Sequence, residues 1–557
     1  MPVASRQGRR IASKACDTCR VRKVQCIFEG ESAACRRCAD SRVDCTFLSD
    51  RKPRGPVARR TPANLNLPVG ELSIEHFCPK ATFRSIIDDF LQLVFPLLPL
   101  VHRPSFRTSI ESAAYTADPA FFRLCLAICA VTVASIPRKF EEYGRDKYAD
   151  VGAMVDRACH MVLLSRIASE PEFQNQPTMA TMIVSILLTM ASHYAGRANQ
   201  GWGYASEAIQ FFRTLELYRK ERYEGLSLLD REMCKRAFWM LYIIQIHDRL
   251  SFIIPHTGLS FDPLRTDWEF LLPCEIDDDD LVLQDHASLQ NSNGCDSPPT
   301  DRPLPVISGF VALVKVFLCV VDLLSDGFPG SPPQAYAMTL GTLRTQTCPN
   351  NPVDGILNTP GIAPTKSTIS LSALLRIIRK LQTTLEELPP VLRISSLDPQ
   401  LQSNHTHPSM TSELTNQFDI MRANIHITSL YIQSSILEAC SNAFTNPQSD
   451  SCSVSPGAEP SSPGHTPRTQ LWVFRKSIAR ELLEVLRFCS SRTLEANGSS
   501  MIVKIREIAA TLLDSDLEVK SDREEQSRQY VAQFADILAN LDYMGQATII
   551  PPIFSGQ

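Results

Sequence analysis

Six of the 18 cysteines lie between positions 16 and 45, in two triplets of identical spacing. Two residues separate the first and second cysteine of each triplet and six separate the second and third, which gives Cys16, Cys19 and Cys26, then Cys35, Cys38 and Cys45. Thiolates are preferred ligands of structural Zn²⁺, which takes four of them in a tetrahedron. Six sulfur atoms fill the eight places around two zinc ions only if two of them bridge. The repeat indicates Cys16 and Cys35, the first member of each triplet, as the bridges.

Three cations follow the first pair of cysteines. Arg20, Arg22 and Lys23 lie in the short stretch that ends at Cys26. A helix that starts at a metal-bound turn would project these side chains from a rigid scaffold, and an α-helix fits the major groove of DNA. Spacing and charge together therefore predict a zinc-dependent DNA-binding unit.

The sequence from Ala15 to Cys26, with Cys35-Arg36-Arg37-Cys38 and Cys45-Thr46-Phe47 after it, resembles the fungal zinc binuclear cluster (C6) transcription factors. The resemblance implies two zinc ions, one held by Cys16, Cys19, Cys26 and Cys35 and the other by Cys35, Cys38, Cys45 and Cys16. It also implies that Arg22 and Lys23 approach base edges, typically of a CGG triplet, and that Arg20 contacts a phosphate. Gln25 stands where the family commonly has lysine, which leaves the base preference open. Residues 29–34 lack the proline common in the family, which concerns only loop geometry.

The alternative interpretations of the six cysteines are a disulfide framework, a RING or LIM domain, and a zinc ribbon. Disulfides are typical of secreted chains, and residues 1–14 contain no apolar signal segment. RING and LIM domains use about eight ligands, and no histidine or further cysteine lies inside the cluster to supply them. A ribbon would leave Cys26 and Cys45 without a role. The alternative function is a zinc-stabilised protein-interaction or ubiquitin-transfer scaffold.

Charge divides the chain into a basic beginning and an acidic remainder. Residues 1–60 carry 15 Lys and Arg against 6 Asp and Glu, whereas the other positions carry 41 against 54. The basic beginning is therefore the end expected to bind a polyanion. The run from Asp50 to Arg60 is interrupted by proline and glycine, as in a linker that contacts phosphates or serves nuclear import. Pro62 and Pro68 exclude a heptad repeat, so we expect a monomer or a dimer without an obvious coiled coil.

After residue 83 apolar residues recur at intervals of three and four, and strand-like alternation is scarce. Helices are expected at 121–136, 151–168, 178–195, 203–220, 230–252, 371–388, 415–440, 471–490 and 499–514. The stretch from Arg231 to Arg249 resembles the basic-basic-x-Phe-Trp helix of the same family's helical regulatory domain, which is followed by a loop with an acidic run, here 277–280. Phe238 and Trp239 belong to its apolar face, and Lys235 and Arg236 lie toward the other.

The expected fold class is mostly α: a small N-terminal binuclear zinc cluster and a large all-α regulatory domain with disordered insertions. The longest apolar run, Gly309 to Leu324, contains Lys315 and Asp322. A second run, Leu124 to Ile136, is too short to span the roughly 30 Å of a membrane interior. Both are expected to be buried helices, and no membrane partner is expected.

The expected divisions follow composition. They are a basic disordered N-terminus (1–14), the zinc cluster DNA-binding domain (15–47), a basic proline-containing linker (48–82), the helical regulatory domain (83–514) with insertions at about 285–306, 326–366 and 441–469, and a C-terminal segment (515–557). Acidic and apolar residues mix at 512–518 and 534–543, which is typical of a coactivator-binding activation region or of an amphipathic helix docked on the core.

No nucleotide-binding loop, nucleophile elbow or zinc-protease motif occurs, so the chain is not expected to be an enzyme. His247 and Asp248 are adjacent on a helix and point about 100° apart, which favours a structural role. The expected function is zinc-dependent, sequence-specific DNA binding that regulates RNA polymerase II genes in the nucleus. The expected partners are double-stranded DNA and the transcription machinery or coactivators, and the helical domain is a candidate site for a small-molecule inducer.

Overall fold

The structure, a computed structural model, describes residues 10–11, 15–22, 24–28, 34–47, 72–250, 267–281, 303–320, 371–394, 411–440, 467–513 and 521–541. The chain divides into two compact units, Met1–Asn66 and Leu67–Gln557.

The first unit consists of short elements held together by the cysteines. β1 (Arg10–Ile11) pairs antiparallel with β2 (Ile27–Phe28). α1 (Asp17–Val21) and α2 (Arg36–Asp40) each contain the second cysteine of one triplet. Helices of this length are not stable alone in water. Five of the six cysteines are buried, and together they form the core of the unit.

In the first half of the second unit, helices pack around α5 (Pro119–Ser135). Asp118 caps its start by accepting a hydrogen bond from the Ala120 backbone N at 2.8 Å. α5 itself carries apolar side chains on all sides, so it is buried among α3, α7 and α8. The elements of this half are η1 (Ile74–His76), α3 (Lys80–Asp89), η2 (Phe90–Val94), α4 (Arg103–Glu111), η3 (Ala114–Thr116), η4 (Pro137–Lys139), α6 (Phe140–Tyr143), α7 (Val151–Ser169), α8 (Met179–Tyr194), α9 (Ala198–Thr214) and η5 (Lys220–Tyr223).

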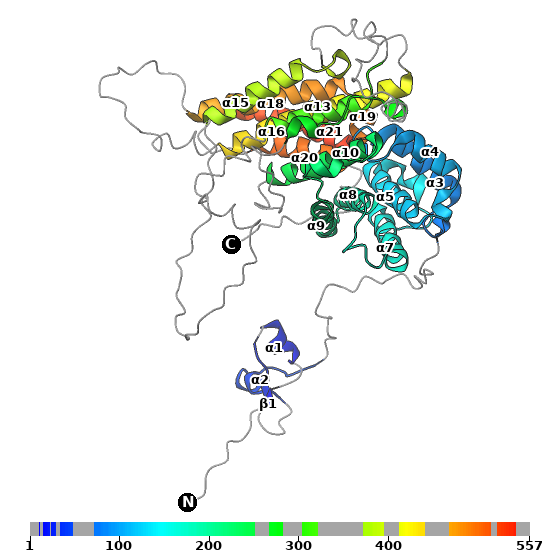
Figure 1. Ribbon diagram of the computed structural model, residues 1–557. Coiled ribbons are helices and arrows are strands. Elements are labelled where there is room, and N and C mark those ends of the chain that lie inside the picture. The colour runs from blue at the N-terminus through cyan, green and yellow to red at the C-terminus, as the bar shows by residue number, and fades with distance from the viewer. Residues whose placement is uncertain are drawn as a thin grey trace, which may run out of the picture. The chain divides into compact units, whose positions relative to one another are not determined.

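In the second half, helices surround α16 (Ser412–Ala439), against which α13, α15, α18 and α20 pack (Figure 1). α10 (Leu228–Leu250) contacts α8 and α9 of the first half and α13 and α16 of the second, so it joins the two halves into one core. The remaining elements are α11 (Trp268–Leu271), α13 (Ile307–Leu318), α15 (Leu371–Glu386), η6 (Pro390–Leu392), α18 (Pro467–Phe488), α19 (Ser491–Glu495), α20 (Gly498–Ala510) and α21 (Ser521–Leu541).

The mostly α fold class is confirmed, and the expected helices agree with α5, α7, α8, α9, α10, α15, α16, α18 and α20 to within a few residues at most of their ends. The basic run at 50–60, most of residues 1–14 and most of the three insertions lie outside the described residues. The described ends of two insertions are residues 303–306, where Val306 is buried, and residues 467–469, where α18 begins. Ile74 and Phe77 are buried, so the packed core of the second unit includes residues before position 83. Phe534 of α21 is also fully buried, and the helix packs against α18, α19 and α20.

Within the described ranges, no single helix is long and apolar enough to cross a membrane. Two neighbouring stretches, Pro119–Ser135 and Pro137–Tyr143, meet the length and composition criteria only together, and they are bent by 101°.

Candidate metal centre and DNA-binding surface

The six sulfur atoms form two groups of four that share Cys16 and Cys35. The Sγ atoms of each group lie within 4.8 Å of one another; the groups are Cys16, Cys19, Cys26 and Cys35, and Cys16, Cys35, Cys38 and Cys45. The Sγ–Sγ distance is 3.5 Å for Cys16–Cys38 and 3.9 Å for Cys16–Cys35. A disulfide needs about 2.05 Å, whereas two sulfur atoms bound at about 2.3 Å to one tetrahedral zinc ion lie roughly 3.8 Å apart. The residues therefore fit zinc by both donor type and spacing.

The backbone around the cysteines repeats their 19-residue spacing. Val24 N donates to Cys19 O at 3.0 Å, and 19 positions later Val43 N donates to Cys38 O at 3.1 Å. The same hydrogen bond thus closes the turn after each short helix. In the second copy this turn contains Arg42 in the left-handed region, at φ 51°. Each triplet is therefore presented by one local fold used twice.

The close packing of the thiols shifts their pKa values in opposite directions. Burial and the neighbouring thiolates raise the pKa of Cys26 to about 11 and that of Cys38 to about 12. Burial also acts to raise the pKa of Cys35, but hydrogen bonds from the Cys38 backbone and from adjacent thiols outweigh it and lower that pKa to about 6. The same balance lowers the pKa of Cys16. The anion is thus most stable at the two shared sulfur atoms, and a dication would hold the other four as thiolates.

The first helix carries the residues expected to contact DNA. α1 ends at Val21, whose side chain is 83% exposed, and Arg22 follows it in an exposed turn. In the part of the chain that the structure describes, Arg22 makes no ion pair. The side chain of Arg20 and all of Lys23 lie outside the described residues. Of the three predicted DNA contacts, only Arg22 has a side chain that the structure describes, and that side chain is exposed.

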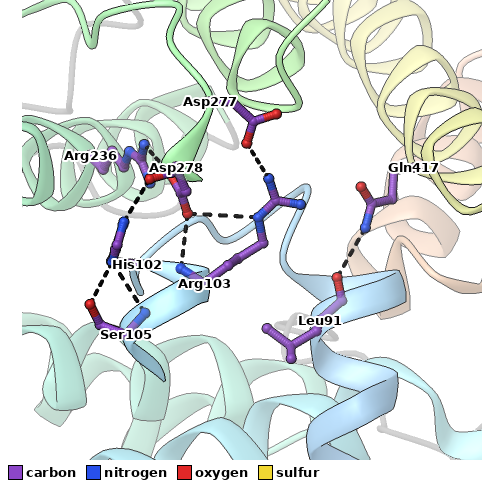
Figure 2. Close-up of polar contacts among 8 residues, drawn as sticks. All are labelled: Leu91, His102, Arg103, Ser105, Arg236, Asp277, Asp278 and Gln417. Carbon is purple, nitrogen blue, oxygen red and sulfur yellow. Dashed lines mark hydrogen bonds and ion pairs between the residues drawn. The ribbon is translucent and has the colours of Figure 1, made fainter. Parts of the chain in front are cut away.

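An ion-pair network around the buried Asp278 joins three segments of the second unit (Figure 2). Arg236 on α10 donates from Nη2 to Asp278 Oδ1 at 2.8 Å, and the backbone N of Arg103 donates to Oδ2 at 3.0 Å. The Arg103 guanidinium pairs with Asp277 at 2.6 Å, and His102 Nε2 lies 2.7 Å from the Asp278 carbonyl oxygen. Burial acts to raise the pKa of Asp278, but the two arginines outweigh it and hold that pKa below its ordinary value. The ionised carboxylate thus ties the start of α4 to α10.

One face of α10 binds the segment that follows α11. Glu232 accepts from the Cys274 backbone N at 2.7 Å and pairs with Lys235 at 2.9 Å. Trp239 donates from Nε1 to the Leu271 carbonyl oxygen at 2.8 Å. Lys235 and Arg236, which the sequence pattern set apart from the apolar face, are both buried. The pairing of α10 with Asp278 was not predicted, although the acidic run 277–280 was its visible signal in the sequence.

His247 has a structural environment. Its ring packs between Phe317 and Tyr431, at centroid distances of 5.4 and 5.5 Å. Burial, with a contribution from Lys504, lowers the pKa of His247 well below its ordinary value. The side chain of Asp248 lies outside those that the structure describes. His247 is therefore placed as a neutral packing residue.

Comparison with known families assigns both parts of the chain. Residues 14–55 match the fungal Zn(2)-Cys(6) binuclear cluster domain, and residues 87–423 match the fungal specific transcription factor domain. The second match covers more than half of the chain. The protein therefore belongs to the fungal zinc cluster family of transcription factors, which are zinc-binding DNA-binding regulators and not enzymes. The resemblance noted in the sequence is confirmed.

Individual relatives are distant. Maltose fermentation regulatory proteins MAL33 and MAL63 of Saccharomyces cerevisiae are 22% and 21% identical to the chain over 44% and 42% of its length, which correspond to 52% and 50% of theirs. Transcription factor macR of Penicillium terrestre is 21% identical over 39% of this chain and 25% of its own length. The chain thus spans about half the length of the maltose regulators it matches. No solved structure gives a significant match.

Proposed function

We propose that the chain is a zinc-dependent, sequence-specific regulator of RNA polymerase II genes that reads CGG-type triplets in the major groove. The observation that carries the proposal is the pair of four-sulfur groups sharing Cys16 and Cys35, next to an exposed Arg22. Since the cysteines form the core of the first unit, the metal ions would fix the helix that leads to Arg22. Double-stranded DNA is the proposed ligand, and the nucleus is the compartment that this function requires.

Two zinc ions are proposed, each held by one of the two sulfur groups. Six thiolates and two Zn²⁺ together contribute a charge of −2. Residues 1–60 carry 15 Lys and Arg against 6 Asp and Glu, so the metal-loaded segment remains strongly positive. A segment of this charge binds DNA phosphates with an affinity that falls steeply as salt rises.

The DNA-contacting roles divide between bases and backbone. Arg22 and Lys23 are proposed to reach base edges, because arginine pairs through two hydrogen bonds with guanine O6 and N7. Arg20 is proposed to contact a phosphate, which positions the helix without reading sequence. The second unit is the proposed regulatory part, which contacts the transcription machinery or coactivators and answers to a small-molecule inducer.

Removal of zinc tests the proposal directly. Fluorescence anisotropy of the full chain is measured with a duplex containing a CGG triplet and with one in which the triplet is scrambled, before and after chelation. We expect two zinc ions per chain by native mass spectrometry and loss of the preference for CGG on chelation. Cys19→Ala and Cys38→Ala should also abolish specific binding, because each removes a ligand from one sulfur group.

Cys489→Ala is the matched control, since this cysteine lies in the second unit, far in sequence from the cluster. It should leave both zinc content and DNA binding unchanged. Full specific binding by chain shown to be free of metal would contradict the proposal. Zinc binding with no preference between the duplexes would instead favour a zinc-stabilised protein-interaction scaffold.

A further inference from the structure

A groove of about 720 Å³ lies where α13 and α15 pack against each other in the second unit. Its lining combines apolar residues, hydroxyl groups and charged side chains. This volume is within the range of about 300–1,000 Å³ that is usual for small-molecule sites. The groove lies far along the chain from the cysteine cluster, and neither the family matches nor the relatives' names assign anything to it.

Cations dominate the charge of the groove. Lys315 on α13 and Arg376, Arg379 and Lys380 on α15 line it, against Glu275 and Glu387. Lys315 pairs with Glu275 at 3.5 Å. Arg376 and Arg379 are exposed and make no ion pair with any residue that the structure describes. Two guanidinium groups are therefore available to an anion that enters the groove.

The spacing on α15 explains why these cations converge. Positions 376, 379 and 380 are three and four residues apart, so their side chains leave the same face of the helix. The opposite side of α15 carries Leu374, Ile377 and Leu381, which are buried in the core. The core thus fixes the direction in which the three cations point.

The rest of the lining suits the organic part of a ligand. Leu318 and Pro389 are partly exposed apolar residues that line the groove. Ser308 also lines it, and within the described part of the chain its buried hydroxyl has no hydrogen-bond partner. A buried hydroxyl without a partner costs free energy that a bound polar group would recover. Thr384 adds a second hydroxyl, which donates to the Lys380 carbonyl oxygen at 2.9 Å and lies 3.3 Å from the Cys319 sulfur atom.

We propose that this groove binds a small organic anion, with its carboxylate or phosphate held by Arg376 and Arg379 and its apolar part on Leu318 and Pro389. Arginine forks match the oxygen atoms of both anions through paired, charge-assisted hydrogen bonds. The inference deepens the proposed function, because it gives the regulatory unit a site and a chemical class for its small-molecule inducer. Binding of an anion can be measured whether or not the proposed function holds, and only the biological role of that binding rests on the proposed function.

Ligand-observed NMR on the zinc-loaded full chain tests the site with defined probes. Phenyl phosphate and phthalate are the two anions, and benzyl alcohol is the neutral counterpart of similar size. We expect at least one anion to bind about tenfold or more tightly than benzyl alcohol. Arg376→Ala with Arg379→Ala should weaken that binding by about tenfold or more. The relative affinities of the two anions decide between phosphate and carboxylate.

The matched control removes two other exposed arginines, Arg84 on α3 and Arg213 on α9, and should leave anion binding unchanged. Equal binding of an anion to wild type and to the Arg376/Arg379 variant would overturn the proposal, as would no anion binding at all. Binding of a polyglutamate peptide that depends on the two arginines, without binding of the small anions, would show a peptide-docking surface and also overturn it. DNA binding is measured on the same samples, so failure here is distinguishable from failure of the proposed function.

Discussion

Arg22 and Val21 present two kinds of chemistry at adjacent positions. Both are exposed, and Arg22 makes no ion pair with a residue that the structure describes. A guanidinium can pair with a guanine edge, and valine methyl groups can pack on a thymine methyl. Contacts to bases discriminate between sequences, whereas contacts to phosphates do not. The role of a single cation is therefore measurable as a difference between two duplexes.

Arg22→Ala should weaken binding to the CGG duplex by about 1–3 kcal/mol and reduce the preference for that duplex. The physical reason is the loss of paired hydrogen bonds to a base edge. Anisotropy titrations with the CGG and scrambled duplexes, at two salt concentrations, measure both quantities.

Arg37→Ala serves as the comparison, because Arg37 is an exposed cation on α2 of the same unit. It should weaken both duplexes alike and lower the salt dependence. An equal loss on both duplexes for Arg22→Ala would reassign Arg22 to phosphate contact.

At the scale of elements, α10 organises the second unit through one polar face. Glu232, Lys235, Arg236 and Trp239 are spaced at three and four residues, and all four contact the segment from Leu271 to Asp278. Asp278 in turn fixes the start of α4. The polar face of α10 therefore holds this segment in place, even though its composition suggests a face exposed to solvent.

Asp278→Asn should destabilise the second unit by about 3–5 kcal/mol, because it leaves the buried Arg236 charge without its partner. Chemical denaturation followed by far-UV circular dichroism measures this in the full chain, where the described helix lies mainly in the second unit.

Asp279→Asn is the matched control, since Asp279 is adjacent, exposed and outside the network. It should change stability by about 0.5 kcal/mol or less. Replacing both partners, Arg236→Met with Asp278→Leu, should recover part of the loss. A double variant as unstable as Asp278→Asn would show that the backbone contacts of Asp278, and not the charge pair, dominate.

At the scale of the whole molecule, a fully buried lysine makes stability depend on pH. Lys504 on α20 donates to Thr428 Oγ1 at 2.7 Å, and burial lowers its pKa from 10.5 to about 7. Between these two values the unfolded chain keeps the lysine protonated while the folded chain releases the proton. Stability from this group is therefore present above pH 10.5 and lost as the pH falls toward 7.

Lys504→Met should consequently be more stable than wild type near pH 7, and the advantage should shrink by up to about 1.4 kcal/mol per pH unit as the pH rises from 7. Urea denaturation at several pH values measures the difference. Lys80→Met, at an exposed position, should show a difference that does not vary with pH in this way. A constant difference for Lys504→Met as well would mean that Lys504 is not desolvated.

The sequence allowed the cysteine cluster and the positions of most helices to be predicted, because both are encoded by local spacing. The Arg236–Asp278 pair and the α15 groove were not predicted, since they depend on segments brought together only by tertiary packing. The π-helix η2 was not predicted either; in it, Phe95 N donates to Phe90 O at 2.7 Å. Periodicity near 3.6 does not reveal such an extra residue per turn. The roles of Arg20, Arg22 and Lys23 remain predictions.

Gln417 donates from Nε2 to the Leu91 carbonyl oxygen at 3.1 Å, across 326 positions of the chain (Figure 2). A ribosome adding about 5–20 residues per second needs roughly 15–65 s to travel that distance. During this time the residues around Leu91 have been synthesised, but α16, which packs against them, has not. Because α16 packs against η2, the apolar side chains of η2 have no cover on the nascent chain until α16 emerges from the ribosome, and we expect the growing chain to need protection from aggregation during that time.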